Sequence, residues 1–247
     1  MAPVILTDLD DTLFQTKPKC PPGATELRQM SSLLDGTASG FATKLQQNFL
    51  LWLEAGLVIP VTARGRDVLA RVNIQSSPAI CSNGGCILDD KGELDLVWHS
   101  QLEIAARHSD PVLDVYRAMT ASLSEVRFRH WSVEENGLDL YIVIKSNERD
   151  DQALAELETE LAPILPADWR CHRNGNNLAY LPPWLSKRHA ARYLIAKFRA
   201  EQPNQPIIGI GDSVSDVGFM DLCDFAAVPT KSQLWTHIVD GSNWIDR

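Results

Sequence analysis

The segment PVILTDLDDT, residues 3–12, decides how the chain is interpreted. Its first five residues form a short apolar run with β-branched side chains, which predicts a fully buried parallel strand. The run stops at Asp8, and Asp10 follows two residues later. Residues two apart in an extended or tightly turning segment point the same way, so we expect Asp8 and Asp10 to face one site. A simple turn or capping cluster is the alternative, because Asp is common after strands.

A second acidic pair follows another predicted buried strand late in the chain. The apolar residues 207–210 predict this strand, and GDSVSD, residues 211–216, comes directly after it. Gly211 permits a close backbone approach, and Asp212 and Asp216 add two carboxylates, although Asp and Ser at a helix N-terminus are the alternative explanation. Carboxylates that lie close together repel unless a cation sits between them, and Mg²⁺ prefers oxygen ligands. We therefore expect the two acidic pairs to share one Mg²⁺.

Further strands and helices alternate around these two segments. Strands are predicted at residues 57–61, 79–81 and 225–228, and a helix at 186–201. Another helix is predicted to end at Gly56, with apolar side chains on one face at helical spacing, namely Phe41, Leu45, Phe49, Trp52 and Leu53. In parallel sheets of this kind, ligands bind at the carboxyl ends of the strands.

The middle of the chain has a different pattern. Residues 87–94 resemble a hairpin around Lys91-Gly92, residues 138–144 and 177–181 predict strands, and residues 151–161 predict a helix. We therefore expect an α/β protein with a Rossmann-like parallel-sheet core, residues 1–85 and 185–247, and an inserted α+β cap domain, residues 86–184. The long connection at residues 15–40 is rich in Pro and Gly and is interpreted as a flap over a site.

Two single residues lie where a phosphate could be bound, although neither is informative alone. Thr62 closes the predicted strand at 57–61 and offers a hydroxyl and a backbone amide to a phosphate oxygen. Lys187 lies in the first turn of the predicted helix at 186–201, where free amides and the helix dipole also favour an anion. They become informative through their order in the chain, because both lie between the two acidic pairs.

In this order the four segments resemble the four motifs of the haloacid dehalogenase (HAD) superfamily phosphatases: Asp8-x-Asp10-x-Thr12, Thr62, Lys187 and Gly211-Asp212-x-x-x-Asp216. The resemblance spans both segments of the predicted core. The inserted section, preceded by the turn Asn83-Gly84-Gly85, is similar to the type IIB subgroup, which includes sucrose-phosphate and mannosyl-phosphoglycerate phosphatases and phosphomannomutases. Two positions depart from the pattern, because Ser215 stands where the fourth motif often has Asn, and Asp11 replaces a frequent Gly.

The resemblance implies a Mg²⁺-dependent phosphatase for a small phosphorylated metabolite, and the subgroup suggests a sugar phosphate. It implies that Asp8 attacks phosphorus to form an aspartyl-phosphate, and that Asp10 is the general acid and base. The implied metal ligands are Asp8, Asp10 through its carbonyl, Asp212 and Asp216, the last as a ligand or in the outer shell. Thr12, Thr62 and Lys187 are the implied phosphate-binding residues. Arg64 either supports the loop or reaches the substrate, and Asn83, Gly84 and Asn177 are candidate substrate contacts.

Aromatic residues of the middle section are candidates for stacking on a sugar, namely Trp98, His99, Trp131, Tyr141, Tyr180 and Trp184. Asn174, Asn176 and Asn177 are candidates for binding hydroxyl groups. Core packing is the commoner role for aromatic residues on strands, and residues 173–176 are most simply a hairpin turn.

Composition and charge argue against other classes of protein. A net charge of −9 disfavours nucleic acid as a partner. As a separate expectation, the protein is a monomer or a homodimer. The five cysteines form no Cys-x-x-Cys pair, so a reducing cytoplasm is the expected location. The longest apolar stretch, residues 49–61, is too short to span a bilayer and contains Glu54. Residues 1–13 contain three aspartates and do not resemble a signal peptide.

Alternative functions use the same residues differently. A phosphomutase would share the whole site with a phosphatase, and the sequence does not separate the two. GDSVSD also resembles the nucleophile segment of Gly-Asp-Ser-Leu serine esterases, which would make Ser213 catalytic but would leave Asp8 and Asp10 without a role. A dinucleotide site is disfavoured, because Val214 stands where the third Gly belongs. A binding or regulatory module without catalysis is disfavoured by the intact acidic residues.

Overall fold

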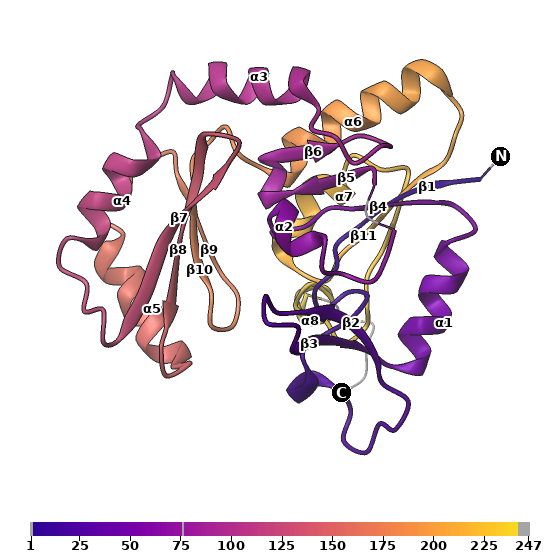
Figure 1. The fold of residues 1–247 in the computed structure, drawn as a ribbon, viewed down its shortest axis with the longest axis horizontal. Coiled ribbons are helices and arrows are strands. Elements are labelled where there is room, and N and C mark those ends of the chain that lie inside the picture. Colours follow the sequence, from indigo (N-terminus) through magenta and orange to yellow (C-terminus); the bar gives the residue numbers. More distant parts are fainter. Residues whose placement is uncertain (1, 76, 242–247) are drawn as a thin grey trace. The chain divides into compact units, whose positions relative to one another are not determined.

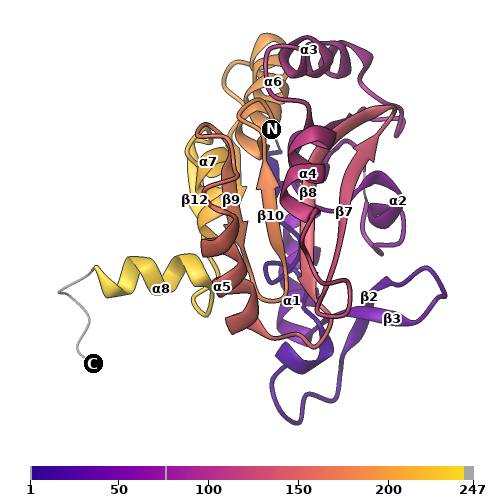
Figure 2. The same cartoon turned by 90° about the vertical axis from the view of Figure 1, so that its left-hand side faces the viewer.

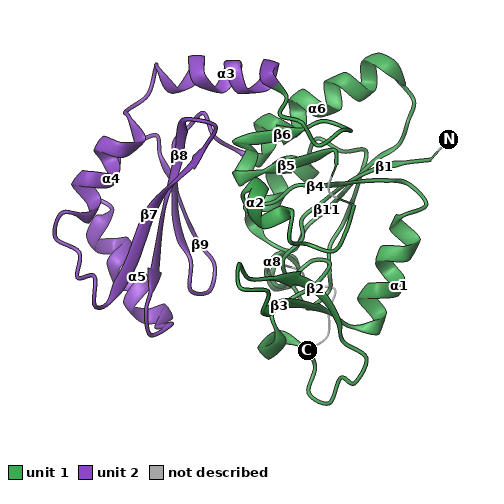
Figure 3. Cartoon of the chain, viewed as in Figure 1, with its two compact units in different colours: residues 1–95, 187–247 green, residues 96–186 purple. Residues whose placement is uncertain are grey.

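A computed structural model describes residues 2–75 and 77–241 (Figure 1). The chain divides into two compact units: unit 1 contains residues 1–95 and 187–247, and unit 2 contains residues 96–186 (Figure 3). The sequence placed the first boundary ten residues earlier, after residue 85. Residues 86–95 lie in unit 1 because β6 (Cys86–Leu88) pairs with β5 (Ala79–Cys81) in an antiparallel ladder.

Unit 1 is built on a four-stranded parallel sheet in the order β12-β11-β1-β4. Its strands are β1 (Val4–Thr7), β4 (Leu57–Pro60), β11 (Ile207–Ile210) and β12 (Phe225–Ala227). Each is a short apolar run ended by Asp, Gly, Thr or Pro, which is why the sequence located all four to within about one residue. The predicted α/β fold with a parallel sheet is confirmed.

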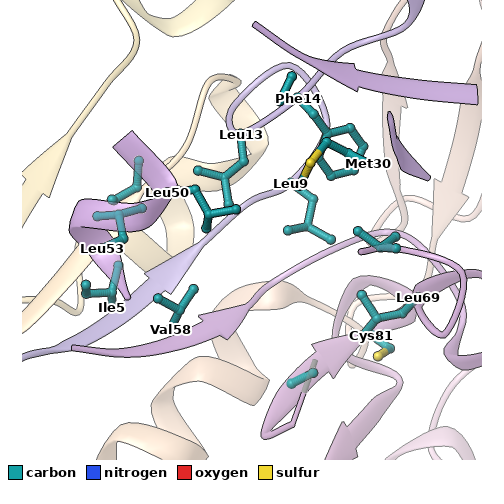
Figure 4. Close-up of a cluster of buried hydrophobic side chains, with 14 of the residues drawn as sticks. Ile5, Leu9, Leu13, Phe14, Met30, Leu50, Leu53, Val58, Leu69 and Cys81 are labelled. Atoms are coloured by element: carbon teal, nitrogen blue, oxygen red, sulfur yellow. The ribbon is translucent and has the colours of Figure 1, made fainter. Parts of the chain in front are cut away.

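Helix α1 (Lys44–Leu53) packs on one face of this sheet. Leu50 and Leu53 are buried in a hydrophobic cluster with Ile5 of β1 and Val58 of β4, which are Cα partners in the sheet (Figure 4). The helix starts at Thr43, whose side chain forms a reciprocal capping box with Gln46.

The predicted inward face of this helix is partly wrong. Leu45 and Trp52 are 79% and 66% exposed, and Phe41 belongs to β3 rather than to the helix. The capping box fixes the start of the helix at Lys44, and the buried side is then centred on Leu50 and Leu53.

Helix α6 (Lys187–Glu201) follows the insertion, and helix α7 (Val217–Met220) follows β11. Ala190, Ala191 and Leu194 of α6 are buried, and so are Phe219 and Met220 of α7. Tyr193 of α6 is half-buried and donates its hydroxyl to Asp95 at 3.0 Å.

The connection expected to be an unstructured flap contains a β-hairpin. Strand β2 (Arg28–Ser32) pairs with β3 (Ala38–Ala42), and a short 3₁₀ turn, η1, covers Lys17–Lys19. The turn between the strands includes Gly36, whose φ of 84° suits a residue without Cβ. Both strands are short, β2 is mostly polar and β3 consists mostly of small residues, so neither has a strong strand signal.

Unit 2 is an α+β arrangement around an antiparallel sheet in the order β7-β8-β10-β9. Its strands are β7 (Phe128–Glu135), β8 (Leu138–Ser146), β9 (Arg170–Arg173) and β10 (Leu178–Leu181). Helices α4 (Val112–Thr120) and α5 (Asp151–Leu161) lie on one face of the sheet (Figures 1 and 2), and α3 (Leu96–Ala106) opens the unit.

Two short helices complete unit 1, α2 (Arg66–Leu69) and α8 (Gln233–Asp240). Another 3₁₀ turn, η2, covers Ser82–Gly84, and a third, η3, covers Val214–Asp216. Within the described ranges, no helix has the length and apolar character needed to cross a membrane.

Candidate active site

Three acidic side chains meet at the carboxyl ends of two adjacent strands. Asp8 follows β1, and its amide donates to the carbonyl of Ile210, the last residue of β11, at 2.8 Å. Asp212 lies two residues beyond β11, and Asp216 follows in the same loop. One carboxylate oxygen from each of Asp8, Asp212 and Asp216 lies within 4.8 Å of the others, and all three residues are buried. The structure thus gathers three of the four aspartates expected at a metal site.

Lys187 is placed among these carboxylates by the start of α6. Its Nζ lies 2.7 Å from Asp8 Oδ1 and 2.7 Å from Asp216 Oδ1, and the lysine is itself buried. Burial lowers the pKa of Lys187, but Asp8 and Asp216 outweigh it and raise the pKa, so the ammonium stays charged. The sequence-predicted Lys187 is therefore at the site, with two carboxylates as its partners.

Asp216 is fixed within its own loop and has no exposed surface. Its Oδ2 accepts from the Ser213 amide at 3.1 Å and from the Ser213 hydroxyl at 2.8 Å, in a capping arrangement at η3. The hydroxyls of Ser213 and Ser215 are 2.7 Å apart, so the residue that replaces the frequent Asn joins the same network. The Ser213 hydroxyl bonds within its own loop, where an esterase nucleophile would be bonded to an imidazole.

Gly211 allows Asp216 to approach the chain closely. A Cβ on Gly211 would lie 2.4 Å from Asp216 Cβ and 2.9 Å from the Met220 sulfur. We expect Gly211→Ala to lower the free energy of unfolding by about 1–3 kcal/mol and to displace Asp216. Urea unfolding compared with Gly218→Ala, whose Cβ would have 3.4 Å to its nearest neighbour, is the matched measurement. Equal stability of the two variants would contradict this prediction.

Asp10 stands apart from the carboxylate cluster and is paired with Arg64. Arg64 Nε lies 2.7 Å from Asp10 Oδ2, and Nη2 lies 2.8 Å from Oδ1. The guanidinium also sits 5.3 Å from the ring centroid of Phe14. In the structure Arg64 contacts the loop that carries Asp10, and its contact with the substrate stays a prediction. Sequence alone gives no signal for this pair, because 54 residues separate its members.

Thr62 and Thr12 are both hydrogen-bonded to other protein groups in the structure. The Thr62 amide donates to the Ile80 carbonyl at 2.9 Å, so the expectation that this amide binds phosphate is wrong. Its hydroxyl oxygen accepts from the Arg64 amide at 3.1 Å, which leaves the hydroxyl proton to donate. The Thr12 hydroxyl donates to Asp212 Oδ1 at 3.3 Å. Thr12 therefore orients an acidic residue, and phosphate binding by either threonine stays a prediction.

The turn at Ser82–Gly84 braces the segment that carries Thr62 and Arg64. The Ser82 amide donates to the Arg64 carbonyl at 2.8 Å, and the Asn83 amide donates to the Thr62 carbonyl at 3.0 Å. Ser82, Asn83 and Gly84 all have positive φ, at 49°, 57° and 98°. Two of them carry a Cβ, so the surrounding contacts must hold this conformation. Ser82 and Asn83 thus have a supporting role that the sequence did not reveal, and substrate contact by Asn83 and Gly84 stays a prediction.

The remaining candidates lie in unit 2. Asn177 precedes β10, and its carbonyl accepts the amide of Asn174 across the β9–β10 hairpin at 3.0 Å. The side chain of Asn176 is bonded to both backbone groups of Ser146. Five aromatic candidates are buried and one, Trp131, is 39% exposed: Trp98, His99, Tyr141, Tyr180 and Trp184 form the buried set. Core packing therefore accounts for most of them, and substrate contact by Asn177 stays a prediction.

The donor set fits a hard divalent cation. Asp8, Asp212 and Asp216 offer carboxylate oxygens, which Mg²⁺ prefers, and Lys187 is the one ammonium bonded to this cluster among the described residues. Three ionised carboxylates against one ammonium leave an excess of two negative charges. Burial is the main reason that the pKa of Asp8 is raised, and Asp216 and Asp10 add to it while Lys187 opposes it. A bound cation would offset the repulsion between these ionised carboxylates.

The raised pKa of Asp212 makes the stability of the protein depend on pH, and this dependence tests the excess negative charge of the cluster. Burial, then Asp216 and then Asp11 raise this pKa to about 7. Because the folded-state pKa exceeds the unfolded value of about 3.9, the stabilisation is complete below that value and is lost as the pH rises through 7. In EDTA we expect the free energy of unfolding to fall by roughly 2 kcal/mol between pH 5 and pH 8.

Saturating Mg²⁺ should remove this fall, because the cation stabilises the ionised carboxylate. Urea unfolding across this pH range, with EDTA and with Mg²⁺, measures the difference. Asp212→Asn is the control, and its stability in EDTA should vary less with pH. An identical pH dependence in EDTA and in Mg²⁺ would contradict cation binding at this cluster.

Fold and site together define the class of protein. A parallel sheet carries a buried aspartate after β1, a second acidic segment after β11 and a lysine at the start of the helix that follows an inserted α+β unit. This is the arrangement expected from the resemblance of the sequence to the HAD superfamily phosphatases.

Comparison with solved structures gives the particular relatives of this fold. Sucrose-phosphatase from Synechocystis sp. PCC6803, in complex with sucrose and phosphate, matches with a TM-score of 0.58 and 18% identity, over 100% of this chain and 90% of that chain. A protein from Thermoplasma acidophilum matches with a TM-score of 0.50 and 14% identity, over 97% of this chain and 89% of that chain. No protein-family model and no curated protein matches the sequence.

Proposed function

We propose that the protein is a Mg²⁺-dependent phosphatase, a phosphoric monoester hydrolase, that acts on a phosphorylated sugar. The observation that carries this proposal is the buried carboxylate of Asp8, held by Lys187 at 2.7 Å and clustered with Asp212 and Asp216 at the carboxyl end of the sheet. A nucleophile needs such orientation, and a phosphoryl group needs cationic partners to offset its charge.

The contacts of Asp8 and Asp10 support a two-step reaction. Lys187 holds Oδ1 of Asp8, which leaves Oδ2 to attack phosphorus and form an aspartyl-phosphate as the bond to the leaving oxygen breaks. Asp10 supplies the proton to that oxygen and then takes one from water, which attacks phosphorus and releases Asp8. Asp8, the Asp10 carbonyl and Asp212 would hold Mg²⁺, with Asp216 bonded to Lys187 and Ser213. When bound, Mg²⁺ neutralises charge on the transferring group.

The substrate class rests on the comparison as well as on the site. The sucrose-phosphatase structure that shares this fold contains sucrose and phosphate. The test is a panel of phosphorylated sugars, polyols and a generic aryl phosphate, assayed with Mg²⁺ and with EDTA, with each product identified by mass spectrometry. Mg²⁺-dependent phosphate release that is fastest with a sugar phosphate is the expected result. Absence of release from every ester would overturn the phosphatase, and release fastest from the generic ester would overturn the sugar.

Product identification also separates a phosphatase from a phosphomutase. A mutase would return the phosphoryl group to a sugar and give an isomeric phosphate, whereas a phosphatase gives the free sugar and inorganic phosphate.

Asp10→Asn tests the role of general acid. We expect phosphate release from a sugar or alkyl phosphate to fall about 10²–10⁴-fold, because the leaving alkoxide needs a proton. In the first turnover, release of nitrophenolate from p-nitrophenyl phosphate should fall much less, since nitrophenolate leaves without a proton. First-turnover release of the alcohol and of nitrophenolate, with the wild type and with the variant, provides the measurement, because later turnovers also need Asp10 as the base. An equal first-turnover loss on the two substrates would show that Asp10 is not the general acid.

A further inference from the structure

The ion pair between Arg64 and Asp10 restrains the residue proposed as the general acid. Both carboxylate oxygens of Asp10 accept hydrogen bonds from one guanidinium, at 2.7 and 2.8 Å. When Asp10 is the acid, one of these oxygens carries a proton. The two-pronged contact occupies both oxygens and fixes the orientation of the carboxylate, so Asp10 can turn toward the leaving oxygen only when this contact loosens.

Arg64 is poorly placed to remain without an anion. Its side chain is only 17% exposed, against 47% for Asp10, and it packs near the face of Phe14. Within the described part of the chain, Asp10 is the one carboxylate at ion-pair distance from Arg64. A partly buried charge that loses its partner is unfavourable, so release of Asp10 requires a replacement anion.

A phosphoryl group at Asp8 would supply this anion. The Arg64 amide is bonded to Thr62, which follows β4 at the same end of the sheet as Asp8. Burial lowers the pKa of Arg64, but Asp10 and then Asp8 raise it, in keeping with a guanidinium that lies near the nucleophile. The planar guanidinium binds carboxylate and phosphate with the same two-pronged geometry.

We propose that Arg64 exchanges partners on substrate binding: it holds Asp10 in the free protein and passes its contact to the phosphoryl group, which releases Asp10 for proton transfer. The inference rests on the proposed function, because it concerns the same site. If the exchange occurs, phosphate and Asp10 compete for one guanidinium. The affinity for phosphate therefore depends on whether Asp10 can bind Arg64.

Binding of inorganic phosphate, measured by calorimetry in saturating Mg²⁺, tests the exchange through a double-mutant cycle. Asp10→Asn removes the competing charge, so we expect the Kd of phosphate to fall by a factor of about 5–150, the usual range for coupled sites. In an Arg64→Gln background, the same change should leave the Kd of phosphate almost unaltered.

Simple charge repulsion gives the opposite result. If Asp10 weakens phosphate binding only through its negative charge, then its removal should tighten binding at least as much when Arg64 is absent. A gain of equal or larger size in the Arg64→Gln background, or no gain from Asp10→Asn in the wild type, would overturn the exchange.

Control variants separate the exchange from misfolding and from the proposed function. Arg66→Gln removes an exposed arginine two residues away and should leave the cycle unchanged. Arg64→Lys keeps the charge but loses the two-pronged contact, so its coupling should be intermediate. Thermal unfolding of each variant checks that it is folded. If the wild type hydrolyses phosphate esters while the cycle shows no coupling, the exchange fails and the phosphatase stands.

Discussion

Asp8→Asn is expected to reduce Mg²⁺-dependent phosphate release by about 10⁴-fold or more, because the variant lacks the attacking carboxylate. The substitution keeps the shape of the side chain, and Asp216 still faces Lys187 at 2.7 Å, so the site should remain assembled. The measurement is initial phosphate release from the best ester of the panel. Mass spectrometry of the quenched wild-type reaction should also detect phosphate on the peptide that contains Asp8, and the variant should lack it.

Ser213→Ala separates this mechanism from the serine-esterase alternative. The Ser213 hydroxyl donates to Asp216, so its loss removes one contact of an acidic residue and should reduce the rate far less than Asp8→Asn. Activity that survives Asp8→Asn but is lost in Ser213→Ala would contradict the aspartyl-phosphate mechanism and support the esterase.

The sheet and its site were predictable because their signal is local. Each strand of unit 1 is a short apolar run that ends in a chemically distinct residue, as Val4–Thr7 does before Asp8. Parallel strands bring their carboxyl ends to one edge, so Asp8 and Asp212 could be placed together although 204 positions separate them. Topology supplied the long-range information that the sequence lacks.

The contacts between side chains were not predictable in the same way. The sequence proposed that Thr62 offers its amide to phosphate, but that amide closes the ladder to Ile80. Asp10 was expected to act as the general acid and base, and no pattern in its segment indicated that Arg64 binds its carboxylate. Such choices depend on where neighbouring elements place donors and acceptors, and no residue pattern along one segment records them.

Asp11 illustrates a departure that the structure explains. This position often carries Gly in the family pattern, and Asp11 has a φ of 62°, in the left-handed region that glycine adopts freely. Asp is among the residues that best tolerate this conformation, and its amide donates to the Phe14 carbonyl at 2.7 Å. The loop therefore keeps its course without glycine.

Lys187→Met is expected to have the largest effect on stability. In the wild type, Lys187 is bonded to two buried carboxylates, those of Asp8 and Asp216, and Met replaces its stem without its charge. Removal of one partner from a buried ion pair leaves the other uncompensated, so the free energy of unfolding in EDTA should fall by about 3–5 kcal/mol. Saturating Mg²⁺ should restore part of this loss, because a cation can take over the compensation of the carboxylates.

Lys197→Met is the matched control for this prediction. It lies on the same helix, and its Nζ is 2.9 Å from Asp95, but its side chain is 51% exposed. The charge of Lys197 is half solvated, and Asp95, whose side chain is 7% exposed, keeps its hydrogen bond from Tyr193, so the loss should be only about 1–2 kcal/mol, and Mg²⁺ should not alter it. Urea unfolding of both variants, in EDTA and in Mg²⁺, gives the comparison. Equal losses for the two lysines, or a loss for Lys187→Met that Mg²⁺ leaves unchanged, would mean that the Asp8 cluster does not carry the excess negative charge on which cation binding depends.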